Sequence, residues 1–225
     1  MTGSIAQKIH QITRQIPDSV RLVAVSKQVP VTKIREAYQA GVRDFGENRL
    51  QEALFKQQQL QDLPDICWHF IGHIQKNKAK KIVENFPWIH SVDSLVLARY
   101  LDKLAAELSC HPKVCLQVKI LPDPNKYGWD VPELRTDLPE LDQLQNLHIQ
   151  GLMIILPLGL NERETAIAFA NTRQLATEIA AQNWTNISMQ QLSMGMSEDY
   201  LLAIAAGATM IRLGRTIFGE RQTNV

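Results

Sequence analysis

The feature that most constrains this chain is a unit that recurs along it. Each unit has a short apolar or β-branched run, then a turn, then a stretch with helical periodicity. Strand candidates lie at 20–26, 43–46, 67–71, 88–92, 113–120, 148–155, 187–192 and 209–213. Helix candidates follow at 31–40, 48–61, 75–85, 94–109, 133–145, 162–182 and 198–206, and a further helix at 4–16 precedes the first strand. Strands that alternate with helices are typical of parallel βα units.

The number of these units predicts how the sheet is arranged. Eight strand candidates in 225 residues favour an α/β fold of the closed (β/α)8 TIM-barrel type, as a single domain over 1–225 with an extra N-terminal helix. A doubly wound open sheet remains the alternative. In a barrel, functional side chains gather where the strands end.

Charge and hydropathy argue against nucleic-acid and membrane partners. The formal net charge is only +1, and the longest nearly apolar run, 151–160, is too short to span a bilayer. The first sixteen residues have no apolar segment of the kind found in secretion signals. A basic run without interleaved aromatic residues reads as a solvated helix face; it comprises Lys76, Lys78, Lys80 and Lys81.

The cysteines indicate where the protein resides. Their number is odd and their spacing fits no zinc or redox pattern; they are Cys67, Cys110 and Cys115. We therefore expect reduced, mostly packed thiols in a cytoplasmic protein.

Lys27 follows the apolar run of the first strand, in "RLVAVSKQVP". A lysine at a strand end commonly extends its ammonium group to solvent. At the mouth of a barrel, however, a partly desolvated lysine amine can attack a carbonyl group and form a Schiff base. That second interpretation requires an anchor that holds the carbonyl compound in place.

The last two strand ends offer such an anchor, because phosphate often binds the loops after strands 7 and 8 of a TIM barrel. The first loop ends in Met194, Gly195, Met196 and Ser197, and the second comprises Gly214, Arg215 and Thr216. The glycines permit close approach of the backbone, and a helix starting near Ser197 would present free N–H groups. The first loop could equally be a turn with a helix N-cap.

Arg212 lies inside the last strand candidate. Alternation along the strand directs it into the barrel, with Ile211 and Leu213 facing the helices. A buried arginine needs an acceptor, which could be a ligand or a carboxylate on a neighbouring strand.

Two further strand ends carry polar residues. Asn48 could line the site, or it could be the N-cap of the next helix in a capping box with Gln51. His69 and His73 could pair on a metal ion, but the sequence offers no obvious third ligand, so we expect no metal site.

Taken together, these segments resemble the pyridoxal phosphate homeostasis protein family. The resemblance is carried by "LVAVSK", "FGENRLQE", "WHFIGHIQKNK", "HSVDS", "GLM" and "LSMGMSEDYLLAIAAGATMIRLGRTIFG", and it extends from about residue 5 to 221. It implies a modified TIM barrel of the alanine-racemase, fold type III kind. It also implies that pyridoxal 5′-phosphate is held as an internal aldimine.

The resemblance also implies roles for individual residues. Lys27 matches the lysine that carries the cofactor, and Arg212 matches the arginine that faces the pyridine nitrogen and keeps it unprotonated. The loop residues 194–197 and 214–216 match the phosphate loops, and Asn48 and His69 fall near the ring. The sequence departs from the family pattern at His73, where proline is frequent, and at Asn125, where serine is usual.

The chain has only Gly219–Val225 after its eighth unit, whereas alanine racemases add a second domain that supplies a tyrosine base. None of the four tyrosines, Tyr38, Tyr100, Tyr127 and Tyr200, occupies a strand end suited to a second base. We therefore expect a monomeric, non-catalytic carrier of pyridoxal phosphate that acts in cofactor homeostasis and amino-acid and keto-acid balance, with apo-enzymes as possible recipients. The alternatives are a monomeric fold type III racemase or decarboxylase, and an aldolase-like enzyme that uses Lys27 on a sugar carbonyl.

Overall fold

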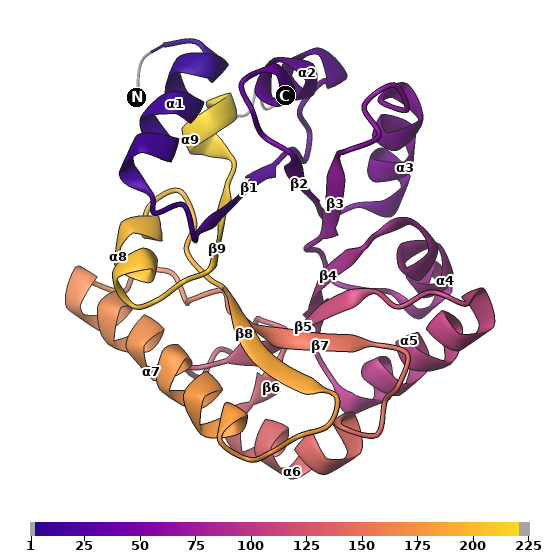
Figure 1. Ribbon diagram of the computed structural model, residues 1–225. Coiled ribbons are helices and arrows are strands. Elements are labelled where there is room, and N and C mark those ends of the chain that lie inside the picture. The colour runs from indigo at the N-terminus through magenta and orange to yellow at the C-terminus, as the bar shows by residue number, and fades with distance from the viewer. Residues whose placement is uncertain (1–2, 221–225) are drawn as a thin grey trace.

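The computed structural model describes residues 3–220 and shows a closed barrel of eight parallel strands (Figure 1). Around the barrel these are β1 (Arg21–Val25), β2 (Asp44–Glu47), β3 (Cys67–Phe70), β4 (Trp88–Val92), β5 (Lys113–Lys119), β7 (His148–Met153), β8 (Ile187–Ser193) and β9 (Met210–Leu213). The short β6 (Trp129–Asp130) pairs only with β5. Because β4 pairs with β5 and β9 pairs with β1, the sheet has no open edge, which confirms the predicted TIM barrel over the open sheet.

Helices surround the strands as an outer ring (Figure 1). They are α1 (Ile5–Gln15), α2 (Val31–Gln39), α3 (Leu50–Gln59), α4 (Lys76–Asn85), α5 (Leu95–Leu108), α6 (Val131–Leu141), α7 (Glu162–Ala180), α8 (Tyr200–Ala205) and α9 (Arg215–Phe218). In residues 3–220, no helix has the combination of length and apolar character that crossing a membrane requires.

The predicted N-terminal helix is present as α1, which lies beside the short α9 in the outer ring (Figure 1). Its apolar stripe, Ile5, Ile9 and Ile12, is buried. The last helix, α9, has only four residues, and α1 packs against both α9 and α2. An N-terminal segment thus completes the ring that the C-terminal unit leaves short.

The barrel has two separate interior layers. Between sheet and helices lies one large apolar core that includes Ile211 and Leu213. Inside the barrel lies a small cluster of Trp88, Cys115, Met153 and Met210. Arg212 is 4% exposed and follows the same alternation as Met210, which confirms that it points into the barrel.

Of three residues with an N-cap signal in the sequence, one caps its helix and two do not. Asn161, which has the spacing to Glu164 that a capping box requires, forms that box at the start of α7. Asn48 is not an N-cap, because α3 begins at Leu50 and Arg49 precedes it. Ser197 is not an N-cap either, since Asp199 immediately precedes α8.

Two surface and packing predictions also agree with the structure. The basic run lies on α4, where three of its lysines, Lys76, Lys80 and Lys81, are exposed. The cysteines at 67, 110 and 115 are unbridged. Burial raises the pKa of the Cys115 thiol to about 12, so this thiol stays protonated and packs as an apolar group.

Candidate functional site

A cavity of approximately 1180 Å³ opens at the carboxyl ends of the strands. Its wall comes from segments that follow β1, β2, β3, β7, β8 and β9, as expected for the functional end of a TIM barrel. Most of the predicted site residues border it, namely Lys27, Asn48, Met196, Ser197, Arg212, Gly214 and Arg215. The fold therefore brings together residues that lie up to 188 positions apart in the chain.

Lys27 lies in the turn after β1, and the backbone on both of its sides is held by α3. Lys56 Nζ donates a hydrogen bond to the Ser26 carbonyl oxygen at 2.6 Å. The Gln28 N–H donates to Glu52 Oε1 at 2.5 Å, and Gln28 has a φ of 61°. A non-glycine residue with this φ is strained, so the two bonds keep the turn in a conformation that it would not adopt alone.

Glu47 completes this buried arrangement beneath Lys27. Its Oε1 accepts hydrogen bonds from Lys56 Nζ at 2.7 Å and from the Ser26 hydroxyl at 2.7 Å. Desolvation raises the pKa of the Glu47 carboxyl above its ordinary value, although Lys56 opposes that shift. Sequence reasoning missed Glu52 and Lys56, because charged residues on a helical pattern normally face solvent, and it also missed Glu47 at the end of β2.

Arg212 is held by backbone and hydroxyl oxygens. Its Nη1 donates to the Ser193 carbonyl oxygen at 2.6 Å and to Ser193 Oγ at 2.7 Å, and its Nη2 donates to the Ile154 carbonyl oxygen at 2.7 Å. These partners replace the neighbouring-strand carboxylate that the sequence left open. Burial lowers the pKa of Arg212 to about 10, so the guanidinium remains charged at neutral pH.

The loop after β8 approaches α8 closely. Gly195 has a φ of 92°, and a Cβ at this position would lie 2.6 Å from the Ala203 Cβ. The Gly195 carbonyl oxygen also accepts the Arg212 N–H at 3.0 Å. Only glycine tolerates both this positive φ and the close approach to Ala203. Gly195 thus positions the loop, although it does not border the cavity.

The same loop is tied to its surroundings at three other points. Met194 is fully buried and donates its N–H to the Met210 carbonyl oxygen at 3.1 Å. The Thr216 N–H lies 3.4 Å from Ser197 Oγ, and Arg215 Nη2 donates to Glu198 Oε1 at 2.6 Å. Met194 and Thr216 therefore support the two loops from behind, whereas Met196, Ser197 and Arg215 border the cavity.

Asn48 borders the cavity, and Gly72 explains how it fits there. A Cβ on Gly72 would lie 2.3 Å from the Asn48 carbonyl oxygen, so the turns after β2 and β3 touch backbone to backbone. The Gly72 carbonyl oxygen accepts a hydrogen bond from Ser91 Oγ at 2.5 Å. Gly72 was visible in the segment "WHFIGH", but nothing local to the sequence shows which backbone approaches it.

His69 does not border the cavity; it lies inside the barrel, fully buried. Its Nε2 lies 2.8 Å from Asp44 Oδ1 and its Nδ1 lies 2.8 Å from His90 Nε2. The other histidine of the suggested pair, His73, instead lies 3.3 Å from Asp93 and stacks on Tyr127. The two histidines at 69 and 73 thus have separate partners.

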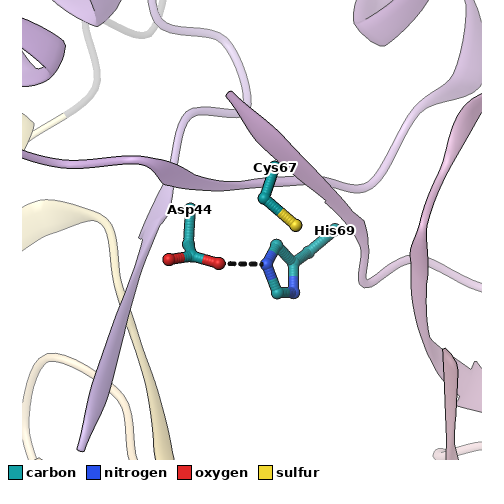
Figure 2. Close-up of side chains that lie close together, drawn as sticks. All are labelled: Asp44, Cys67 and His69. Carbon is teal, nitrogen blue, oxygen red and sulfur yellow. Dashed lines mark hydrogen bonds and ion pairs between the residues drawn. The ribbon is translucent and has the colours of Figure 1, made fainter. Parts of the chain in front are cut away.

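Within residues 3–220, Asp44, Cys67 and His69 form a group with possible metal-ligand atoms within 4.8 Å of one another (Figure 2). The carboxylate and the imidazole are already hydrogen-bonded to each other, and Arg21 lies 3.7 Å from the same carboxylate oxygen. Burial raises the pKa of the Cys67 thiol to about 11, so a ready thiolate ligand is not provided. These contacts favour a hydrogen-bonding role over metal binding.

Among the tyrosines, Tyr200 borders the cavity, which the sequence did not indicate. Its hydroxyl hydrogen-bonds to Gln15 Oε1 of α1 at 3.1 Å, and burial raises its pKa above the ordinary value. The phenol therefore attaches α8 to α1 and is a poor base.

Comparison with known proteins gives a consistent result. Residues 2–222 match the family described as alanine racemase, N-terminal domain. The chain is 54% identical to the pyridoxal phosphate homeostasis protein of Synechocystis sp. over 211 residues, which cover 94% of this chain and 96% of that protein. It is 39% identical to the protein of the same name from Escherichia coli K12, with 91% and 87% covered.

Solved structures agree with this result. PipY of Synechococcus elongatus PCC7942, described as having PLP bound, superposes with a TM-score of 0.92 at 54% identity, over 96% of this chain and all of that chain. An alanine racemase of Clostridium difficile 630 superposes with a TM-score of 0.79 at 13% identity, over 98% of this chain and 58% of that one. The racemase likeness concerns the fold alone.

Proposed function

The chain belongs to the pyridoxal phosphate homeostasis protein family, and we propose that it binds pyridoxal 5′-phosphate through a Schiff base to Lys27 and serves as a carrier of the cofactor. The observation that carries this proposal is the shared cavity. Lys27, Arg212 and the two loops after β8 and β9 all border it.

The residues present suit each part of that cofactor. A lysine amine can react with the aldehyde, and the Ser197 hydroxyl and the Arg215 guanidinium are donors for the phosphate. Arg212 remains a cation at the cavity wall, which favours an unprotonated pyridine nitrogen opposite it. Asn48 offers a side-chain amide on the other side of the cavity.

The covalent step is a condensation. The neutral amine of Lys27 adds to the aldehyde carbon, and water leaves as the carbon–nitrogen double bond forms. No oxidant is needed and the step is reversible, so hydrolysis returns the free aldehyde and the free amine. Reversibility is the property that a carrier requires.

A carrier role fits the acid–base groups around the cavity better than a racemase role. Asp199 accepts the Met196 N–H at 2.6 Å, Glu198 is paired with Arg215, and the Tyr200 hydroxyl is bonded to Gln15. These three groups are therefore engaged in holding loops and α1, and the other carboxylates among the described residues that border the cavity are Glu162 and Glu220. An opposing acid–base pair is what two-sided proton transfer would need.

Addition of pyridoxal phosphate to the purified protein, followed by borohydride, tests the proposal. We expect a visible absorption band and a reduced adduct whose mass maps to the peptide containing Lys27. Lys27→Ala should abolish both, and Lys33→Ala, which removes an exposed lysine one turn into α2, should change neither. An adduct formed equally well by the Lys27→Ala variant would refute the assignment.

A second experiment separates a carrier from an enzyme and examines recipients. The loaded protein is mixed with an apo-enzyme, with and without a dilute trap for free pyridoxal phosphate. Cofactor transfer without amino-acid turnover supports the carrier. Exchange of an amino-acid α-proton that is lost in Lys27→Ala would instead establish a fold type III enzyme. Gel filtration of the loaded protein tests the monomer that we propose.

A further inference from the structure

A line of buried polar side chains runs through the inside of the barrel, from Arg212 at the main cavity to the other end of the strands. After Arg212 come Ser193 of β8, His90 of β4 and His69 of β3, each with 0% exposure. The line ends at Asp44, the first residue of β2. Asp44 borders a second cavity of approximately 410 Å³ at the amino ends of β1 and β2.

Each neighbouring pair in this line is within hydrogen-bond distance. Arg212 Nη1 lies 2.7 Å from Ser193 Oγ, and Ser193 Oγ lies 2.7 Å from His90 Nδ1. His90 Nε2 lies 2.8 Å from His69 Nδ1, and His69 Nε2 lies 2.8 Å from Asp44 Oδ1, the contact drawn in Figure 2. We call these five residues the interior chain.

The chemistry of the two ends fixes the direction of every bond between them. A guanidinium can only donate, so Ser193 Oγ accepts from Arg212, and its own hydrogen is available to donate to His90 Nδ1. An ionised carboxylate can only accept, so His69 donates from Nε2 to Asp44 and accepts at Nδ1 from His90 Nε2–H. The donors and acceptors assigned from the two ends agree when both histidines are neutral and carry their proton on Nε2.

The surroundings keep both imidazoles neutral. Burial lowers the pKa of His69, although Asp44 opposes the shift. Burial lowers the pKa of His90 further, and neighbouring His69, Arg212 and Arg21 act in the same direction. The titratable or charged groups that act on the interior chain and its neighbours include Arg21 of β1, Asp44 of β2, Cys67 of β3, Lys113 and Cys115 of β5, Asp199 before α8 and Arg212 of β9.

We propose that Asp44, His69 and His90 are positioning residues that act through Ser193 to hold the Arg212 guanidinium in place against the cofactor ring. This inference rests on the proposed binding of pyridoxal phosphate. Hydrogen bonds in a chain polarise one another, so the carboxylate at one end makes Ser193 Oγ a stronger acceptor for Arg212 at the other. A change at the amino end of the barrel thereby alters a contact in the cofactor cavity.

The first test uses the protein without cofactor. Nitrogen NMR of the imidazole rings should show His69 and His90 neutral at pH 7, with Nε2 protonated and Nδ1 unprotonated. In Asp44→Ala the fixed tautomer should be lost, and the Arg212 side-chain N–H groups should exchange faster with solvent. Asp44→Asn keeps an acceptor oxygen and should retain the tautomer. If either His69 or His90 is doubly protonated or protonated on Nδ1 in the unmodified protein, the hydrogen bonds assigned to the interior chain are wrong.

The second test uses the protein loaded with pyridoxal phosphate. Asp44→Ala should weaken cofactor affinity by roughly three- to tenfold, the effect of about one lost hydrogen bond. It should also shift the pH at which the visible absorption band changes, a signature that a merely structural role would not move. The matched control is Asp65→Ala, which removes a carboxylate that pairs with Arg43 at 2.6 Å and does not belong to the interior chain.

The outcomes separate this proposal from the proposed function. If the unmodified protein takes up no pyridoxal phosphate, the proposed function fails, and the interior chain is judged by the histidine and Arg212 signals alone. If the unmodified protein binds the cofactor and Asp44→Ala matches Asp65→Ala in affinity and in spectrum, the positioning role fails while the proposed function stands.

Discussion

At the residue scale, Lys27 depends on a buried lysine that does not itself border the cavity. Lys56 is 4% exposed and reaches the Ser26 carbonyl, Glu47 and Glu52 at once. Its charge compensates a carboxylate, and its position fixes the turn that presents Lys27. A single side chain therefore links the stability of the barrel to the position of Lys27 at the cavity.

Replacing Lys56 with methionine should destabilise the protein by about 3–5 kcal/mol, because Glu47 would be left buried without its counter-charge. Urea denaturation measures this change in the free energy of unfolding. The double variant Lys56→Met with Glu47→Gln should recover part of the loss, since the uncompensated charge is then absent.

Lys80→Met on the exposed face of α4 serves as the control and should stay within about 0.5 kcal/mol of the unmodified protein. Equal stabilities for Lys56→Met and Lys80→Met would contradict the role given to Lys56.

The sequence predicted the place of those cavity residues whose position follows from strand alternation or from strand ends, such as Arg212 and Lys27. It did not predict Lys56, because a lysine in a helical stretch looks solvated until the strand beneath it is known. It also implied a place near the cofactor ring for His69. The residue pattern of one strand cannot show that Asp44 and His90 instead hold the His69 imidazole inside the barrel.

At the scale of elements, helix starts depend on the turn before them. Asn48 and Asn161 have the same spacing to a following Gln or Glu, yet only Asn161 caps its helix. The turn after β2 carries Asn48 toward the cavity and against Gly72, so α3 begins two residues later. The tertiary contact decides between two uses of the same local signal.

These two asparagines form a matched pair for experiment. Asn161→Ala should lower the free energy of unfolding by about 1 kcal/mol through the lost cap. Asn48→Ala should cause no loss of capping but should weaken pyridoxal phosphate binding. Thermal unfolding and cofactor titration on both variants check this; equal affinity in the two variants would count against Asn48 as a cavity residue.

The N-terminal helix offers a second prediction at this scale. Ile12 is fully buried between α1 and the barrel, so Ile12→Ala should cost about 2–5 kcal/mol of stability. Gln11→Ala, the adjacent exposed position on the same helix, should have little effect. Chemical denaturation of both variants would show whether α1 is an integral part of the ring; similar midpoints would show that it is not.

At the scale of the whole molecule, the recurring βα units made the closed barrel predictable, because eight parallel strands with intervening helices leave few other arrangements. The interior was less predictable. Side chains inside the barrel come from at least seven strands, and their pairing depends on the register between neighbours, which bulges shift at β4–β5, β5–β7 and β7–β8. The residue pattern of one strand does not show these shifts in register between neighbouring strands.

The buried histidines give the whole protein a pH dependence. In the unfolded chain His69 and His90 bind protons as the pH falls below about 6.5, whereas burial keeps them neutral in the fold. Their contribution to stability is therefore complete above pH 6.5. It decreases as the pH falls toward the lowered pKa values, by up to about 1.4 kcal/mol per pH unit for each histidine.

Unfolding free energies measured between pH 7 and pH 5 check this expectation. His90→Gln should show a shallower decline than the unmodified protein, and His148→Gln, at an exposed position, should show the same decline. A slope that is unchanged in His90→Gln would contradict the linkage.

The pairing of β1 with β9 has a consequence for how the protein is made. On the ribosome the segment with Lys27 is synthesised before β9, so β1 can pair with β2 first but lacks its second neighbour until residues 210–213 have been synthesised. Arg212 arrives on that same last strand. Lys27 is therefore synthesised long before Arg212, which borders the same cavity, so the cavity is incomplete until β9 has been added.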